Sequence, residues 1–462
     1  MGCGAGGEAE LGQEPVCGGG EDVRRAVGRN LTDGRSARCV MSHGMTLSRR
    51  AALAATLLGP VAALVPAGPA LAGPAAGRAT VLAPDREQAR LADPRAAAFP
   101  RRAGLDDFVA RFPAALRSAR SRDEVERLVD AWGEALWWAA VHRAQGRRPG
   151  GDLPAGDDRP LYWTRLAMTV QLADWQPVFD VDRTALRGRL EDASRGLTGN
   201  DFSGRPGLRR LFVSGFDPFG LDQELRRANP SGSAALLLNG RRITLADGTP
   251  AEIRSVLLPV RYGDFDRGIV ERAFGPRMAA GPRAAHAITT VSQGYPGLFT
   301  LEAWAGRARS ADPYPDNTGA LSGGTPDRPV PPPGLAAGPE FIASTLPGEA
   351  VTGAVQEPYP VLWNTSVTEI PAGGDRPVER EDGPTPGSRA VAGGGGGYLS
   401  NEVAYRSNRL RLELAPQLPG GHLHTPVLTG LPADPGLLTG PEFERNEAAI
   451  TAEVLAVLTH VL

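Results

Sequence analysis

From Leu208 to the C-terminus, short apolar runs alternate with segments of helical spacing, and this alternation restricts the fold more than any other feature of the chain. Strands are expected at 211–214, 253–260 and 287–291, and helices at 231–238, at 265–274 and from Pro441 onward. Strands that alternate with helices predict an α/β fold, with helices on both faces of one sheet. Ligands in such folds bind where the strands end, so functional residues are expected there.

A helical region precedes the α/β part, and we place it at residues 101–207. Ser121 and Glu124 form a capping box, and apolar residues recur at helical spacing from there to Gln145. Two further helices are expected, at 161–175 and 182–197. Five of the seven tryptophans lie in this region, where their spacing indicates a packed core and not a ligand site. Residues 73–100 are rich in Ala, Pro and Arg, and we expect a linker there.

The N-terminal part of the chain carries a targeting pattern. Arg49 and Arg50 form a twin arginine, a mainly apolar stretch follows, and Ala70-Leu71-Ala72 has the form of a cleavage site. We therefore expect a twin-arginine-type signal peptide at 45–72, a misassigned upstream extension at 1–44, and a secreted or extracytoplasmic mature protein. A transmembrane anchor is the alternative, although the apolar stretch is short for a membrane span. All three cysteines precede the signal, so the mature chain would have no disulfide or thiolate site.

The charged residues exclude several classes of function. The formal net charge is only −2, so no basic footprint points to nucleic acid or to an anionic membrane. All 50 basic residues are arginines, which excludes a lysine nucleophile, Schiff-base chemistry and a P-loop. We expect no nucleic-acid partner and no stable membrane anchor, and the sequence leaves the oligomeric state open.

Five glycines at 393–397 lead through Tyr398 and Leu399 to Ser400, after which a helical pattern begins. Backbone N–H groups and the dipole of a helix N-terminus stabilise developing negative charge, so Ser400 occupies the position of a nucleophile. Serine is also a favoured N-cap residue, and glycine runs are often flexible loops. A purely structural role for Ser400 therefore stays open at this point.

Eight short motifs follow one another in order between Leu208 and Leu462. They are Gly215–Gly220 (GFDPFG), Asn229–Ser231 (NPS), Leu258–Val260 (LPV), Gln293 with Glu302, Pro315–Asn317 (PDN), Ser344–Pro347 (STLP), Tyr398–Asn401 (YLSN) and His424 in HLHTP. In this order they resemble the motifs of the pyroglutamyl peptidase I family of cysteine peptidases. Each motif alone is weak, but eight in one order are hard to obtain by chance.

The resemblance implies a catalytic triad that acts on an N-terminal pyroglutamyl residue without a cofactor. Carried over by position, Ser400 replaces the family's nucleophilic cysteine, His424 is the general base and acid, and Glu302 orients the imidazole. The residues implied to bind substrate are Phe216 and Phe219, as apolar walls, and Asn229 and Gln293, as polar contacts. A small uncharged cyclic amide needs this combination of apolar enclosure with a few hydrogen bonds.

Three positions depart from the family pattern. Ser400 stands in place of the cysteine, the arginine between the family's Gln and Glu has no counterpart, and the asparagine after its Glu is replaced within 303–307. A serine hydroxyl cannot be held as a resting anion, as a thiol can, so it must lose its proton to His424 during the attack. The exchange is compatible with a Ser–His–Glu triad and equally with a decayed enzyme.

His422 lies two residues before His424, on the same face if the segment is a strand, and it is easily confused with the catalytic histidine. A His-x-His pair can also bind zinc. No third ligand is well placed in the sequence, so we expect no metal.

These observations predict two domains: a helical domain at 101–207 and a pyroglutamyl-peptidase-like three-layer α/β/α sandwich at 208–462. The leading hypothesis is hydrolysis, through Ser400, of the amide next to an N-terminal pyroglutamyl or similar group, with a peptide or small cyclic amide as substrate. The alternatives are a non-catalytic protein that keeps the pocket and binds such groups, and a serine hydrolase of changed substrate.

Overall fold

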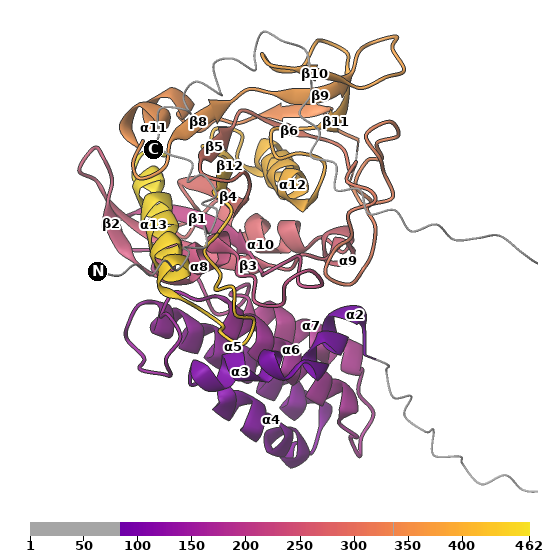
Figure 1. Ribbon diagram of the computed structural model, residues 1–462, viewed down its shortest axis with the longest axis vertical. Coiled ribbons are helices and arrows are strands. Elements are labelled where there is room, and N and C mark those ends of the chain that lie inside the picture. Colours follow the sequence, from indigo (N-terminus) through magenta and orange to yellow (C-terminus); the bar gives the residue numbers. More distant parts are fainter. Residues whose placement is uncertain (1–83, 336) are drawn as a thin grey trace, which may run out of the picture. The chain divides into compact units, whose positions relative to one another are not determined.

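The structure, a computed structural model, describes residues 84–335 and 337–462 (Figure 1). The expected upstream extension at 1–44, the signal peptide at 45–72 and the first part of the linker, 73–83, lie outside the described residues. Among the described residues, no helix combines the length and the apolar character needed to cross a membrane.

A seven-stranded sheet with the order β2-β3-β1-β4-β12-β5-β8 forms the centre of the α/β part. Its strands are β1 (Arg209–Phe216), β2 (Arg242–Thr244), β3 (Pro250–Leu258), β4 (Ala287–Gln293), β5 (Phe299–Glu302), β8 (Val361–Asn364) and β12 (Gly420–Thr425). Strands β3, β1, β4 and β12 run parallel to one another, whereas β2, β5 and β8 run in the opposite direction. The parallel strands therefore all end at the same edge of the sheet.

Helices cover both faces of this sheet (Figure 1). The helices are α8 (Pro230–Leu238) and α13 (Pro441–Leu458), which pack on each other, and α10 (Ile269–Met278) and α12 (Leu399–Leu414), which pack on each other. Successive residues of β1 point to the two layers: Leu211 and Val213 pack with α8 and α13, and Phe212 packs with α10 and α12. The predicted three-layer α/β/α sandwich is confirmed.

Shorter elements complete the α/β part. They are α9 (Tyr262–Asp266), α11 (Gly348–Ala354), the paired strands β6 (Trp304–Gly306) and β7 (Phe341–Ala343), and a small sheet of β9 (Val367–Ile370), β10 (Val378–Arg380) and β11 (Arg389–Ala392). Strands β10 and β11 lie within 371–397, a segment rich in Pro and Gly. Buried Glu369 accepts hydrogen bonds from Arg380 and Thr385 and stabilises this sheet, whose strands are too short for a periodic pattern.

The helical region contains α2 (Arg86–Ala89), a 3₁₀ turn (Arg90–Ala92), α3 (Pro94–Arg102), α4 (Asp106–Ser118), α5 (Arg122–Ala144), α6 (Arg159–Asp174) and α7 (Arg183–Ser194). Helices α5, α6 and α7 confirm the three that the sequence predicts. The expected linker is wrong over its described part, because Asp85 and Asp93 cap two helices, Pro94 occupies the first turn of α3, and Phe99 is fully buried.

One apolar cluster contains residues of both the helical region and the α/β part. Leu221, Leu225 and Leu257 of the α/β part pack in the same cluster as the buried side chains of α3 to α7. Contacts between the two regions therefore reach the elements that carry the predicted site.

Candidate active site

Ser400 lies in the first turn of α12, directly after the glycine run. The N-cap of α12 is Tyr398, so the N-cap role that the sequence left open for Ser400 is not the one observed. Ser400 is half-buried, and its side chain makes no hydrogen bond to any described residue. The first N–H groups of a helix have no intrahelical acceptor, so the backbone at Ser400 can stabilise an anion.

A small pocket lies where β1, β3 and β4 end. Its lining residues are Phe216, Phe219, Asn229, Val260, Ser292, Gln293, Tyr398, Leu399 and Ser400. The structure thus brings together the predicted nucleophile and all four residues predicted to bind substrate. The cavity volume is about 20 Å³, which is room for a single water molecule. A larger occupant therefore requires the walls to move apart.

The two polar residues of the pocket differ in what they can offer a ligand. The Asn229 side chain donates to the carbonyl oxygen of Asp217 (3.1 Å) and accepts from the backbone and hydroxyl of Ser231 (3.2 and 2.8 Å). Gln293 accepts from the Leu428 N–H (3.3 Å), and its amide nitrogen has no partner among the described residues. Asn229 thus holds the wall together, whereas Gln293 can still donate to a ligand.

Glu302 and His424 form a buried pair on adjacent antiparallel strands, β5 and β12. His424 Nδ1 lies 2.8 Å from Glu302 Oε1, and the two residues are 4% and 2% exposed. The same carboxylate accepts from Thr300 Oγ1 (2.5 Å) and Asn364 Nδ2 (2.7 Å). Because an ionised carboxylate only accepts hydrogen bonds, this arrangement places the imidazole proton on Nδ1 of His424.

His422 occupies the other side of the His424 ring. The two Nε2 atoms are 3.4 Å apart, and the rings meet edge to face with centroids 4.6 Å apart. His422 also lies within hydrogen-bond distance of Thr290 Oγ1 (2.7 Å, to Nδ1) and Ser292 Oγ (2.9 Å, to Nε2). Burial, with His424 nearby, lowers the pKa of His422 well below its usual value, so His422 is neutral at pH 7.

The Glu302–His424 pair lies beside the pocket, with His424 on the strand next to the one that carries Ser292. β12 pairs with β4 so that His424 lies opposite Ser292, which lines the pocket. Gly294 packs against the His424 ring so closely that an added Cβ would lie 2.6 Å from its Cβ. Among the hydrogen bonds of the described residues, none joins His424 to Ser400. Of the three residues of the predicted triad, Glu302 and His424 are therefore hydrogen-bonded to each other, and Ser400 is not bonded to either.

Sequence reasoning missed several residues of this site. Thr300 and Asn364 complete the shell of Glu302, and Ser292 links His422 to the pocket. Asn401, which follows the serine, joins α12 to β6 through Gly306 and Ala308. Only Asn401 had a signal, since it belongs to one of the eight motifs; the others are ordinary polar residues in strands.

Three buried carboxylates lie behind the pocket wall. Ligand atoms of Asp157, Asp158 and Glu447 all lie within 4.8 Å of one another. Each carboxylate already has a donor: Arg159 pairs with Asp157, the Asn229 N–H bonds to Asp158, and the Ser233 hydroxyl bonds to Glu447. Burial, with Asp157 nearby, raises the pKa of Glu447 to about 7. The cluster therefore holds a proton that the unfolded chain would release.

Glu447→Gln is expected to change the pH dependence of stability. A carboxyl whose folded pKa is raised stabilises the fold below its unfolded pKa, and this contribution is lost as the pH rises through the folded value. Between about pH 4.5 and pH 7 the wild type should lose up to about 3 kcal/mol of unfolding free energy relative to Glu447→Gln. Urea unfolding at both ends of this range measures the difference. Exposed Glu442→Gln is the control, and equal slopes for both variants would contradict the assignment.

Comparisons with known proteins match both parts of the chain. The family model described as PA0049 N-terminal domain matches residues 70–191, and that described as PA0049, C-terminal domain matches 210–331 and 344–429. The uncharacterised protein PA0049 of Pseudomonas aeruginosa is 35% identical over an aligned length of 459 residues. The match covers 78% of this chain and 83% of that protein.

Solved structures of pyrrolidone carboxyl peptidases are similar to part of the chain. The Pyrococcus furiosus protein is 22% identical, with 55% of this chain and 100% of that chain covered and a TM-score of 0.36. The Thermococcus litoralis protein is 17% identical, with 54% and 94% covered and a TM-score of 0.35. Structural similarity with TM-scores this low gives no evidence about the reaction.

Proposed function

The chain belongs to the PA0049 family, and from that premise we propose that it is an amide hydrolase acting through Ser400, His424 and Glu302. Its substrate is a peptide or small amide with an N-terminal pyroglutamyl or similar cyclic group. The observation that carries the proposal is the buried Glu302–His424 pair, which lies one strand away from the pocket. This pocket contains Ser400, whose hydroxyl makes no hydrogen bond to any described residue.

The proposed reaction has two stages. Ser400 Oγ attacks the carbonyl carbon of the scissile amide while its proton passes to His424 Nε2. The C–N bond then breaks as His424 returns the proton to the leaving amine. Water next attacks the acyl-serine, and the same proton transfers release the acid and restore Ser400. Glu302 stabilises the imidazolium in both stages, and the N-terminal backbone of α12 stabilises the oxyanion.

Two local changes accompany substrate binding in this proposal. His424 Nε2 faces His422 in the resting structure, so Ser400 must replace His422 as its neighbour. The pocket must also widen, because its present volume of about 20 Å³ holds only a water molecule. Phe216 and Phe219 then enclose the apolar part of the ring, and the free amide of Gln293 donates to the lactam carbonyl.

A non-catalytic binding protein is the second candidate function, and the contact between His422 and His424 favours it. A general base whose lone pair faces another histidine does not activate a serine. A serine hydrolase of changed substrate is the third candidate. Export through the twin-arginine-type signal at 45–72 belongs to the same proposal and rests on the sequence pattern alone.

A fluorophosphonate probe tests whether the serine is activated. The wild type should be labelled stoichiometrically, Ser400→Ala should not be labelled, and Ser292→Ala, which changes the other serine of the pocket, should keep the label. Intact-mass spectrometry counts the labels. Labelling that persists in Ser400→Ala would exclude Ser400 as the nucleophile, and an unlabelled wild type would favour the binding protein.

A further inference from the structure

The turn Gly215–Gly220 supplies two walls of the pocket, Phe216 and Phe219. Asp217, which lies between them, forms ion pairs with two arginines. We propose that the helical region is part of the active site: Arg165, Arg195 and Asp158 are positioning residues that hold this turn and Asn229 in place. The claim that these residues affect substrate binding rests on the proposed hydrolase. The claim that they hold the turn and Asn229 in place does not.

Two arginines of the helical region hold the carboxylate of Asp217. Its carboxylate is 1% exposed, Arg165 Nη2 of α6 donates to Oδ1 (2.5 Å), and Arg195 Nη1, at the end of α7, donates to Oδ2 (2.5 Å). Charge-assisted hydrogen bonds are stronger and more directional than neutral ones. The two guanidinium groups thus set the direction of the Asp217 side chain, and with it the backbone between the two phenylalanines.

Asp158 anchors the neighbouring wall of the pocket. It is the N-cap residue of α6, and its carboxylate accepts from the Asn229 N–H (3.2 Å). Asn229 in turn donates to the Asp217 carbonyl oxygen (3.1 Å). Arg165 follows Asp158 by seven residues, or two helical turns, so one face of α6 contacts both wall segments.

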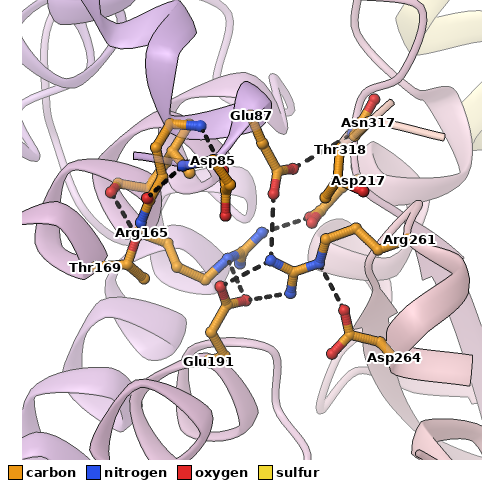
Figure 2. Close-up of polar contacts among 12 residues, drawn as sticks. Asp85, Glu87, Arg165, Thr169, Glu191, Asp217, Arg261, Asp264, Asn317 and Thr318 are labelled. Carbon is orange, nitrogen blue, oxygen red and sulfur yellow. Dashed lines mark hydrogen bonds and ion pairs between the residues drawn. The ribbon is translucent and has the colours of Figure 1, made fainter. Parts of the chain in front are cut away.

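Further buried charges extend this arrangement to the start of the described chain (Figure 2). Glu191 bonds to Arg195 (2.8 Å) and to Arg261 (2.9 Å), and Arg261 bonds to Glu87 of α2 (3.2 Å). In Figure 2, Glu87 and Glu191 lie on opposite sides of the Arg261 guanidinium. Asn317 completes the connection, because its amide donates to the Pro218 carbonyl oxygen of the turn (2.9 Å) and lies 3.5 Å from Glu87.

Buried acidic side chains and arginines alternate through this network, and Asp264 adds a further carboxylate on Arg261 (2.7 Å). Glu87, Glu191 and Asp217 face Arg165, Arg195 and Arg261. Buried ion pairs contribute little net stability once desolvation is counted, but their hydrogen bonds restrict the groups to one arrangement. We therefore assign the network to positioning of the pocket.

Amide hydrogen exchange of Arg165→Met tests the structural half without any substrate. Exchange of residues 215–231 should rise about tenfold, since one charge-assisted bond to the turn is lost. Arg165→Lys should restore part of the protection. Arg189→Met on α7, whose partner Asp130 lies on the surface, should leave this segment unchanged. Exchange that is unchanged at 215–231, or that rises equally throughout the protein, would overturn the proposal.

Two further measurements keep the test decisive. If Arg165→Met does not fold, Asp158→Ala removes the second anchor and the same exchange experiment applies to it. With a pyroglutamyl amide substrate, KM should rise about tenfold in Arg165→Met while kcat changes much less. A fall in kcat alone would contradict positioning of the pocket. If the wild type shows no turnover, the proposed hydrolase fails, and the exchange result still decides whether the helices hold the pocket.

Discussion

Glu302→Gln is expected to lower kcat by about 10³- to 10⁴-fold with little change in KM. The Glu302 carboxylate accepts from Thr300 and His424 on one oxygen and from Asn364 on the other. A glutamine cannot accept at both positions. If its amide nitrogen faces His424, the imidazole proton moves to Nε2, which then cannot accept a proton from Ser400. If it faces Asn364, two donors meet and the imidazolium loses its counter-charge.

Asn364 cannot relieve this conflict by turning its own amide. Its Oδ1 already accepts from the Ser366 N–H (3.1 Å), and a flip would break that bond. Steady-state kinetics with a pyroglutamyl amide measures the loss. Glu369→Gln is the matched control, because Glu369 is also a fully buried strand glutamate but lies outside the site. Glu302→Gln activity within about tenfold of the wild type would contradict the proposed role of Glu302.

The layered part of the fold could be predicted because its signals are local. The parallel strands β1, β3 and β4 contain apolar runs that are buried on both faces, whereas β12 (GGHLHT) contains no such run. Helix α5 follows an N-cap serine and has apolar residues at helical spacing. The short strands β6 to β11 could not be predicted, since runs of three or four residues carry no period.

Buried charged side chains explain why the linker expected at 73–100 was wrong over its described part. Arg159, Arg165 and Arg195 are among the largest fully buried side chains of the described part, although pattern analysis treats arginine as a surface residue. Their partners come from distant segments, so neither the ion network nor the burial of Glu87 can be inferred from spacing. A segment rich in Ala, Pro and Arg therefore resembled a linker but forms α2 and α3.

The site was predictable as a set of residues but not as a geometry. Motif order placed Phe216, Phe219, Asn229, Gln293 and Ser400 in one pocket, and it paired Glu302 with His424. It could not predict that His422 would occupy the Nε2 side of His424, because that contact depends on side-chain orientation within β12. Nor could it show that the Asn229 amide is bonded within the wall.

The central claim is that Ser400 and His424 can work together although they are not bonded in the resting structure. Ser400→Cys separates the two requirements, because a thiol ionises beside an imidazole far more readily than a hydroxyl. Ser400→Ala removes the nucleophile and leaves the pocket wall nearly unchanged. The pair of variants therefore distinguishes a working serine from a pocket that has lost its nucleophile.

The most direct measurement is release of a fluorophore from a pyroglutamyl amide by the purified mature protein, with Ser400→Ala and Ser400→Cys in parallel. Our account predicts turnover by the parent that Ser400→Ala abolishes. No turnover by the parent, with activity gained in Ser400→Cys, would contradict the serine mechanism. It would leave the proposed pocket and general base standing. No fluorophore release by any of the three proteins would contradict the proposed pyroglutamyl hydrolase and favour a binding role or a different substrate.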